Sequence, residues 1–282
     1  MIKYLAGIFD AEGYVRIRKT KSKSGKKYSY TPEAKIYMCD RRIVDEFAKL
    51  YKLEVKSESR GNNRKTAYYV SLGVKKLRES SFIEDVLPFL NEKRLQLNEV
   101  KQLINGTKEK EQCYQDYMVY KKTFDHKIHG VLSYEYIAGV LDGDGWFTMF
   151  SASRNKQTVY NKFALGLEQR YKPMVEYLLK FGGNVRSKEV KDIINHIETH
   201  EWKTYNSNEI LVLAKEIHPF LIEKKETCKR FIEYITKYEE FRSYSKKVLK
   251  EHQCFWLVWD IIPILYIIIK IMKDKKMEDC LV

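Results

Sequence analysis

The chain has 282 residues, of which 44% are hydrophobic and 32% charged, a composition that is typical of a folded protein and excludes a disordered tail. It carries 52 Lys and Arg against 38 Asp and Glu, a net charge of +14, so we expect a polyanionic partner such as nucleic acid. Its five cysteines are scattered and form no C-x-x-C pair, which argues against a disulfide framework or a cysteine zinc site. The first motif starts at Tyr4 and leaves no room for a cleavable signal peptide, so we do not expect secretion.

The first part of the chain predicts a short series of elements. An apolar helix is expected at 4–13 (YLAGIFDAEG), ending at Gly13. Alternating apolar and polar side chains then predict two strands, at 14–20 (YVRIRKT) and 33–38 (EAKIYM). A helix over 41–51, two further strands over 53–59 and 65–73, and closing helices to about 105 complete this part.

The same order of elements returns further along the chain. A helix is expected at 136–145 (YIAGVLDGDG), followed by strands at 145–153 and 161–169, a helix at 172–181, strands at 184–190 and 200–207, and closing helices at 209–217 and 223–241. A second pair of matching segments, LPFLNEK at 87–93 and HPFLIEK at 218–224, keeps nearly the same separation as the two decapeptides. We therefore infer duplication of a whole α+β unit. The predicted domains are a first repeat over 1–106, a linker over 107–132, a second repeat over 133–243 and a C-terminal extension over 244–282.

Both motif helices contain small residues among large apolar ones, at Ala6, Gly7, Ala138 and Gly139. A glycine inside a helix costs about 1 kcal/mol relative to alanine, and close approach of another backbone is the usual reason for accepting that cost. We therefore expect the two motif helices to pack against each other.

Each motif helix ends with two acids, Asp10 and Glu12 in the first copy and Asp142 and Asp144 in the second. The C-terminal end of a helix is already negative and favours cations, so two packed helices would bring four carboxylates to an unfavourable place. Carboxylates and backbone carbonyls are suitable ligands for Mg²⁺, and a divalent metal would balance the charge. A solvated helix end would explain one such motif, but it explains the duplicated pair less well.

The two decapeptides resemble the signature of the LAGLIDADG homing endonucleases in their single-chain, two-repeat form, and the resemblance extends over about residues 3–243. It implies an α+β fold of tandem pseudo-twofold αββαββα repeats, whose two antiparallel sheets form a saddle backed by helices. It also implies a monomer without an obligate protein partner.

The resemblance assigns roles to the acids and to residues near them. It implies that Glu12 and Asp144, with the backbone at Ala11 and Gly143, hold two or three catalytic Mg²⁺ ions, for which Mn²⁺ can substitute. Asp10 and Asp142 would have a structural role at the helix ends. Residues that position water and neutralise the transition state would be Lys93 and Lys224, with Gln169 and Asp40, just after the second strand of each copy, as weaker candidates. A solvated helix start is the open alternative for the two lysines.

The faces of the sheets that are not covered by helices would bind the major groove of DNA. The outward set is expected to include Arg16, Arg18, Lys35, Tyr37, Trp146, Thr148 and Lys162. Lys19 and Lys21 lie in the basic run KTKSKSGKK, which would contact phosphates, although such a run can also be a soluble loop. The two copies differ at most outward positions, so we expect an asymmetric target.

The resemblance implies a site-specific, metal-dependent endonuclease that makes double-strand breaks in long DNA targets and is encoded by a mobile intron or stands free. Its location would be the cytoplasm of a bacterium or phage-infected cell, or an organelle matrix. An intron RNA maturase and a catalytically inactive DNA-binding protein stay open as alternatives. The apolar segment 254–272 is either a membrane anchor or a segment folded onto the protein.

Overall fold

The computed structural model describes residues 1–22, 25, 27–59, 65–123, 127–154, 158–191 and 196–252. The chain forms two compact units, Met1–Glu233 and Tyr234–Val282. The apolar segment 254–272 lies outside the described residues, so both interpretations of it stay predictions. Within the described part of the chain, no helix combines the length and apolar character needed to cross a membrane.

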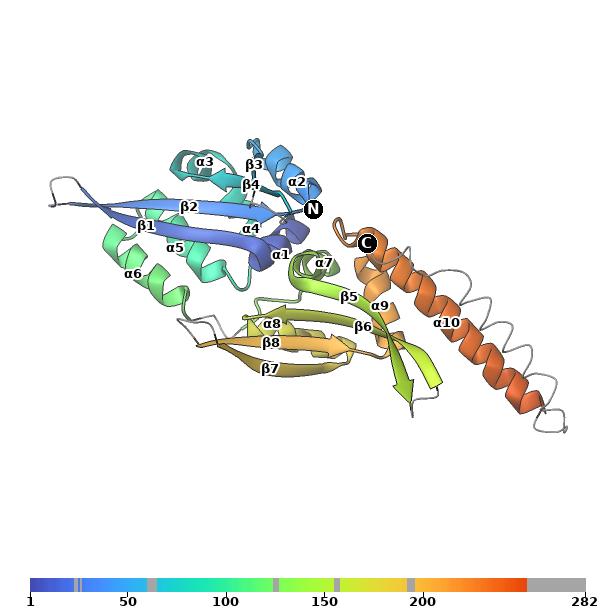
Figure 1. Cartoon of the computed structure of the whole chain (residues 1–282). Coiled ribbons are helices and arrows are strands. Elements are labelled where there is room, and N and C mark those ends of the chain that lie inside the picture. The colour runs from blue at the N-terminus through green and yellow to red at the C-terminus, as the bar shows by residue number, and fades with distance from the viewer. Residues whose placement is uncertain are drawn as a thin grey trace. The chain divides into compact units, whose positions relative to one another are not determined.

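The first repeat folds around an antiparallel sheet with the strand order β1-β2-β4-β3 (Figure 1). Its elements are α1 (Ile2–Glu12), β1 (Gly13–Lys21), β2 (Tyr28–Met38), α2 (Arg41–Tyr51), β3 (Lys56–Glu58), β4 (Ala67–Leu72), α3 (Val74–Glu79), α4 (Phe82–Val86) and α5 (Arg94–Asn105). The predicted order of helix, two strands, helix, two strands and closing helices is confirmed.

The second repeat has the same topology, with the strand order β5-β6-β8-β7. Its elements are α7 (Tyr134–Asp144), β5 (Gly145–Arg154), β6 (Thr158–Gln169), α8 (Lys172–Tyr177), a 3₁₀ turn η1 (Leu178–Phe181), β7 (Asn184–Lys191), β8 (His196–Thr204), α9 (Ser207–Ile217) and α10 (Lys225–His252). The α+β fold class is thus confirmed, and α10 continues from the first compact unit into the second.

One face of each sheet forms the core and the other is open. In β1 and β2 the buried residues alternate with exposed or half-buried ones, and Val15, Ile17, Ala34 and Ile36 all lie on the covered face. Helices α2, α3 and α5 contact the first sheet, while α8 and α9 contact the second. This alternation is the pattern on which the strands were predicted, because an antiparallel sheet can bury one face only.

The segment between the repeats contains a helix, α6 (Lys110–Tyr120), in the stretch that sequence analysis assigned to a linker. Cys113 and Tyr117 of α6 are buried, and the Tyr117 hydroxyl donates a 3.0 Å hydrogen bond to the backbone oxygen of Val15 in β1. The connection therefore packs against the first sheet as part of its helical layer.

Candidate functional site

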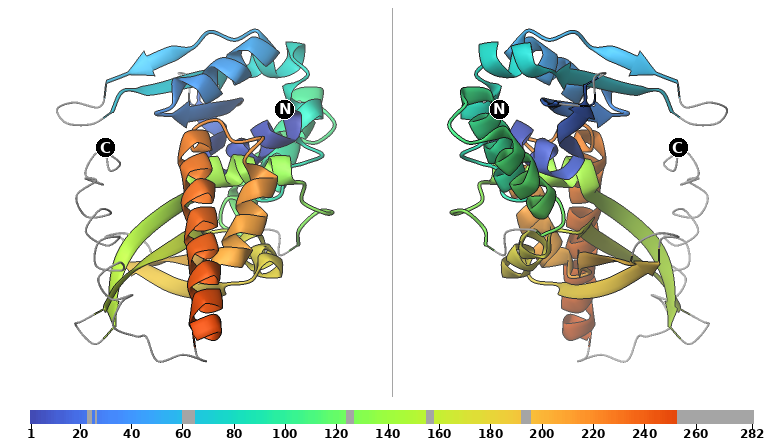
Figure 2. Two further views of the ribbon diagram at one scale, coloured as in Figure 1. Left: turned by 90° about the vertical axis from the view of Figure 1, so that its right-hand side faces the viewer. Right: turned by 90° about the vertical axis from the view of Figure 1, so that its left-hand side faces the viewer.

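The two motif helices, α1 and α7, pack side by side between the two sheets (Figure 2). A Cβ atom at Gly7 would lie 2.2 Å from the backbone oxygen of Tyr136, and one at Gly139 would lie 2.1 Å from that of Tyr4. No side chain fits at that distance, so glycine is required at both positions. Ala6 and Ala138 beside them are fully buried. The contact is reciprocal, as a duplicated helix packed on its own copy requires.

The glycine that ends each motif helix has a different role. Gly13 and Gly145 have extended backbones, with φ of −75° and −84°, so neither is a left-handed cap. A Cβ at Gly13 would lie 2.2 Å from the backbone oxygen of Phe9, and one at Gly145 would lie 2.5 Å from the Leu141 side chain. These glycines let the chain turn directly from helix into strand, and that turn places the last acid of each motif at the start of a sheet.

Asp10, the first acid of the first motif, is buried and accepts three hydrogen bonds. Two come from the backbone N–H groups of Asn91 (2.7 Å) and Lys93 (2.8 Å), and the third comes from the hydroxyl of Tyr136 (2.6 Å) in the other motif helix. Burial raises the pKa of Asp10, while the charge of Lys93 and these hydrogen bonds oppose the shift. Asp10 therefore joins the closing loop of its own repeat to the helix of the other.

Asp142 repeats this arrangement with the partners exchanged. Its carboxylate accepts hydrogen bonds from the backbone N–H groups of Ile222 (2.6 Å) and Lys224 (2.8 Å) and from the hydroxyl of Tyr4 (2.7 Å). The matching segments 87–93 and 218–224 are thus the loops that bind the first acids. The sequence patterns did not predict this role, although the nearly equal spacing between each acid and its loop was the signal that could have revealed it.

The last acids, Glu12 and Asp144, lie at adjoining helix ends. A Cβ at Gly143 would lie only 2.5 Å from the Ala11 Cβ and 3.2 Å from the Glu12 Cγ, so the two ends meet there. Glu12 keeps access to solvent and Asp144 is half-buried. Partial loss of solvent raises the pKa of both carboxyls, and the charge of Asp144 raises the pKa of Glu12 further.

Lys93 and Lys224 place their ammonium groups at the C-terminal ends of the motif helices. Lys93 Nζ donates to the backbone oxygen of Asp10, and Lys224 Nζ donates to those of Leu141 (2.9 Å), Asp142 and Gly143 (3.2 Å). Both lysines do stand at helix starts, since α5 begins at Arg94 and α10 at Lys225. Their side chains are not solvated, however: that of Lys93 is 12% exposed, and burial lowers the pKa of Lys224. The two cations therefore neutralise helix ends that also carry the acids.

Gln169 contacts the second of these acids. Its Nε2 donates a 2.7 Å hydrogen bond to Asp144 Oδ2. In the strand register Gly13 faces Ile36 and Gly145 faces Leu167, so the counterpart of Gln169 in the first repeat is Met38.

Asp40, the other weaker candidate, is not the counterpart of Gln169. It accepts a 2.9 Å hydrogen bond from the backbone N–H of Arg42 at the start of α2 and forms an ion pair with the same residue. Asp40 therefore caps a helix, and its role in positioning water stays a prediction. Asp144 has an amide donor, whereas the matching position of the first repeat, Met38, holds a thioether.

The donor set at the helix ends suits a hard divalent cation. Among the described residues there is no group of three or more His, Cys, Asp or Glu that could hold a metal by itself. The site offers the carboxylates of Glu12 and Asp144 and nearby backbone oxygens, all of them oxygen ligands. Mg²⁺ commonly binds with one or two protein carboxylates and completes its shell with water and phosphate oxygens. The residues present fit an ion that is shared with a phosphodiester.

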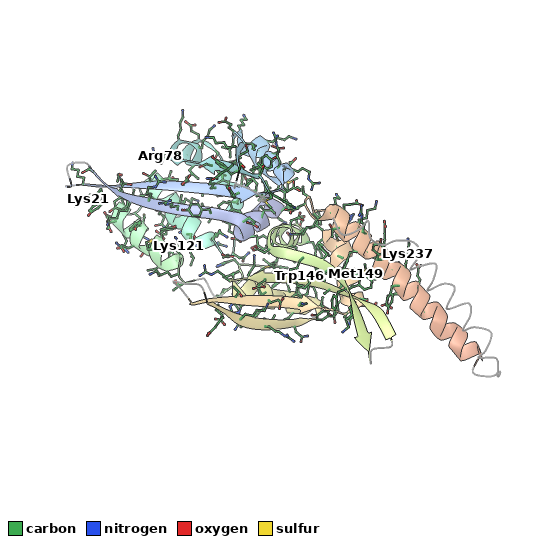
Figure 3. The ribbon with its side chains drawn as sticks, viewed as in Figure 1. Lys21, Arg78, Lys121, Trp146, Met149 and Lys237 are labelled. Carbon is green, nitrogen blue, oxygen red and sulfur yellow. The ribbon has the colours of Figure 1, made fainter. Side chains whose placement is uncertain are left out.

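The open faces of the sheets carry most of the residues predicted to contact DNA. The strand register places Arg16, Arg18, Lys35 and Tyr37 on the open face of the first sheet, and Trp146, Thr148 and Lys162 on that of the second. Figure 3 shows Trp146 near the start of β5 and Lys21 at the far end of the β1–β2 hairpin.

Lys19 differs from the expectation for the basic run. It alternates with Val15 and Ile17 and so lies on the helix-covered side of β1, where its Nζ pairs with Glu111 of α6 at 2.7 Å. Its ammonium group also lies 4.5 Å from the ring centre of Tyr28. A lysine held in this way is not available to phosphates, so Lys19 is a brace between hairpin and connecting helix. Lys21 follows the same alternation but lies exposed at the strand end.

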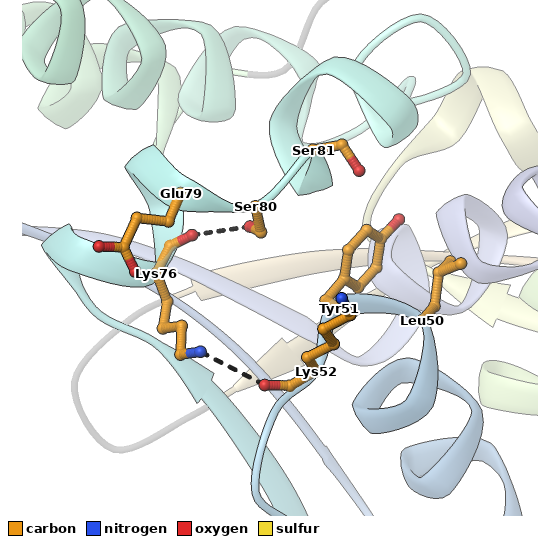
Figure 4. A pocket seen from close by; sticks show the side chains of 7 residues that line it. All are labelled: Leu50, Tyr51, Lys52, Lys76, Glu79, Ser80 and Ser81. Carbon is orange, nitrogen blue, oxygen red and sulfur yellow. Dashed lines mark hydrogen bonds between the residues drawn. The ribbon is translucent and has the colours of Figure 1, made fainter.

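A pocket of about 250 Å³ lies apart from the acids, between the end of α2 and the end of α3 (Figure 4). It is lined by Leu50, Tyr51, Lys52, Lys76, Glu79, Ser80 and Ser81. Lys76 Nζ donates a 3.3 Å hydrogen bond to the backbone oxygen of Lys52, which also lines the pocket. The ammonium group of Lys76 is therefore held against the pocket wall. No residue of either motif lines this pocket, so the pocket is separate from the candidate site at the ends of α1 and α7.

Comparison with solved structures agrees with this fold. No family model and no curated protein matches the sequence. The solved I-SmaMI LAGLIDADG homing endonuclease bound to cleaved DNA is similar with a TM-score of 0.67 at 14% identity, over 90% of this chain and 95% of that one. I-GzeII in complex with its DNA target gives a TM-score of 0.62 at 15% identity, over 89% and 95% of the two chains. I-AabMI bound to uncleaved DNA also gives 0.62 at 15%, over 85% and 92%. The resemblance stated from the sequence is thus confirmed in the fold.

Proposed function

We propose that this chain, which has the two-repeat fold of the LAGLIDADG homing endonucleases, is a metal-dependent, sequence-specific endonuclease that cuts both strands of a long asymmetric DNA target. One observation carries the proposal: Glu12 and Asp144 converge at the joined ends of two packed helices, with a lysine beside each end. The solved neighbours bound to DNA support a DNA partner. The surplus of basic residues supports the same partner.

Glu12 and Asp144, with the backbone oxygens of Ala11 and Gly143, would hold two or three Mg²⁺ ions, and Mn²⁺ would substitute. When bound, such ions lower the pKa of a water molecule and stabilise the leaving oxygen of the phosphodiester. The chain would supply the orientation of the ligands. The Gln169 amide fixes one oxygen of Asp144 by its 2.7 Å hydrogen bond and leaves the other oxygen for a ligand.

Lys93 and Lys224 would supply positive charge where a phosphate gains negative charge. Both ammonium groups are held by backbone oxygens at the helix ends, so little reorganisation is needed when the phosphate arrives. Half-burial strengthens their interaction with an anion relative to water. The open sheet faces on the same unit would bind the duplex and set the position of the scissile bonds.

The direct test is cleavage of a library of long duplexes with Mg²⁺, followed by sequencing of the cut ends. We expect one asymmetric site to be cut, and we expect Glu12→Gln and Asp144→Asn to abolish double-strand cutting while binding in Ca²⁺ is retained. Glu216→Gln, an exposed glutamate on α9, is the matched control and should cut normally. Tight binding without any cutting would favour the inactive DNA-binding alternative. Preference for intron RNA over the duplex would favour the maturase.

A further inference from the structure

The open faces of the two leading hairpins, β1–β2 and β5–β6, differ in chemistry at matched positions. Gly13 and Gly145 begin the two hairpins in the same register, so the following pairs correspond one to one. The first hairpin presents the pairs Tyr14–Lys35, Arg16–Glu33 and Arg18–Thr31, and the second presents Trp146–Gly166, Thr148–Ala164 and Phe150–Lys162. Four of these six residues are charged in the first hairpin and one of six in the second.

The open face of the second hairpin has an apolar floor, which we define as Trp146, Thr148, Phe150, Ala164 and Gly166. The Trp146 ring lies over Gly166, since a Cβ at that glycine would lie 2.2 Å from the ring. Ala164 is fully buried although it shares the open face, whereas Thr148 and Phe150 remain exposed. The floor therefore offers the Thr148 methyl group and the Phe150 ring, with few hydrogen-bonding groups.

Cations stand at the border of the apolar floor. Lys203 Nζ lies 4.8 Å from the ring centre of Trp146 and 5.2 Å from that of Tyr205. Tyr205 in turn lies 6.1 Å from Phe150, and Lys162 Nζ is 5.8 Å from the Tyr205 ring. Both lysines lie beside the Tyr205 ring, where they can contact phosphates while the floor itself faces base edges, an arrangement that suits a duplex groove.

The first hairpin has the opposite character. Arg16 and Arg18 project from alternate positions of β1 on the open face. Glu33, opposite Arg16, accepts a 2.9 Å hydrogen bond from Ser71 Oγ, and Lys35 Nζ lies 3.9 Å from the Tyr69 ring centre. These partners are part of the sheet, while the two guanidinium groups have no partner among the ion pairs of the described residues.

The bases exposed in the major groove also differ in whether they present an apolar group or hydrogen-bond acceptors. Thymine alone presents a methyl group there, and threonine methyls and phenylalanine rings contact it. Guanine presents two acceptors, O6 and N7, that match the two donors of an arginine. We propose that the apolar floor selects thymines in the half-site bound by the second repeat, and that Arg16 and Arg18 select guanines in the half-site bound by the first. This inference rests on the proposed function and specifies its substrate.

The test starts from duplexes selected from random DNA by binding in Ca²⁺. In the selected target, deoxyuridine replaces thymine in one half-site at a time, which removes only the methyl group, and 7-deazaguanine replaces guanine, which removes only N7. We expect deoxyuridine to weaken binding about tenfold in one half-site and 7-deazaguanine to do so in the other. Phe150→Ala should weaken the response to deoxyuridine and leave the response to 7-deazaguanine unchanged, and Arg18→Ala should do the reverse.

The reciprocal variants make the outcome independent of any general loss of affinity, because each variant keeps one of the two responses. A target that is bound and cut but indifferent to both analogues would overturn the inference and leave the proposed function intact. A deoxyuridine response that is undiminished in Phe150→Ala would likewise overturn the inference alone. Failure to select any duplex would overturn both.

Discussion

The hydroxyl of Tyr4 in the first motif helix donates a 2.7 Å hydrogen bond to Asp142 in the second, and the hydroxyl of Tyr136 in the second donates a 2.6 Å hydrogen bond to Asp10 in the first. All four side chains are buried. Each carboxylate also binds the loop that carries the lysine of its own repeat. The crossed pairs therefore join both helices and both loops, so that the two repeats cannot separate without exposing buried charge.

The first prediction concerns these crossed tyrosines. Tyr136→Phe should lower the free energy of unfolding by about 1–3 kcal/mol, because the buried Asp10 carboxylate loses a donor and gains no replacement. Tyr4→Phe should have a similar effect through Asp142. Urea denaturation measures both. Tyr14→Phe, at an exposed position, is the control and should change stability by less than about 0.5 kcal/mol. Equal stability of all three variants would contradict the role of the crossed pairs.

The second prediction concerns helix contact. Gly7→Ala should destabilise the protein by about 1–3 kcal/mol, because the added methyl meets the Tyr136 backbone oxygen, although alanine favours a helix by about 1 kcal/mol. Gly73→Ala is a suitable control, since a Cβ there meets nothing within 4 Å. Thermal unfolding of the two variants measures the difference. If Gly7→Ala is as stable as the parent, the helices do not pack this closely in solution.

The third prediction concerns pH. Burial raises the pKa of Glu92 from 4.5 to about 7, and its side chain is 16% exposed. Because the folded state holds this proton more tightly than the unfolded state, stability falls as the pH rises from about 4.5 to about 7 and does not recover above it.

Glu92→Gln mimics the protonated form and removes that loss. It should stabilise the metal-free protein by an amount on the order of 1–3 kcal/mol near pH 8 and change little near pH 4.5. Urea denaturation at both pH values measures the effect, with Glu216→Gln as the exposed control. If Glu92→Gln stabilised the protein only at low pH, that result would contradict a raised pKa of Glu92.

The fourth prediction concerns the difference between the two acids. Gln169→Met would give Asp144 the same neighbour that Met38 provides in the first repeat. We expect one strand to be cut about 10- to 100-fold more slowly, because the amide no longer orients the carboxylate. A supercoiled plasmid that carries the target should then accumulate as a nicked circle. Met38→Leu should cut both strands at the parental rates. If Gln169→Met slows the cleavage of both DNA strands equally, Glu12 and Asp144 do not act independently on the two strands.

The fifth prediction separates two neighbouring cations of β1. Arg18→Ala should relax base preference and leave the slope of log affinity against log salt unchanged, because Arg18 is assigned to a base edge and not to a phosphate. Lys19→Ala should alter neither, because Lys19 is paired with Glu111 on the covered face. It should instead lower stability slightly, because the ion pair with Glu111 is partly exposed to solvent. Weaker DNA binding by a stable Lys19→Ala protein would return Lys19 to the interface.

The elements and the repeat could be predicted because they depend on local patterns. Alternation in β1 and β2 identified the covered and open faces, and the small residues of the two motifs identified helices that approach closely. The same alternation would have placed Lys19 on the covered face. That signal was overlooked in favour of the charge of the run in which Lys19 lies.

Residue type and spacing along the chain were sufficient to predict the duplication, the α+β class and the acids at the helix ends. The folded arrangement was needed to show that Tyr4 reaches Asp142, that Lys224 donates to backbone oxygens of α7, and that Gln169 corresponds to Met38. Such contacts join residues far apart in the chain. Their partners depend on strand register and helix packing, which no local pattern encodes.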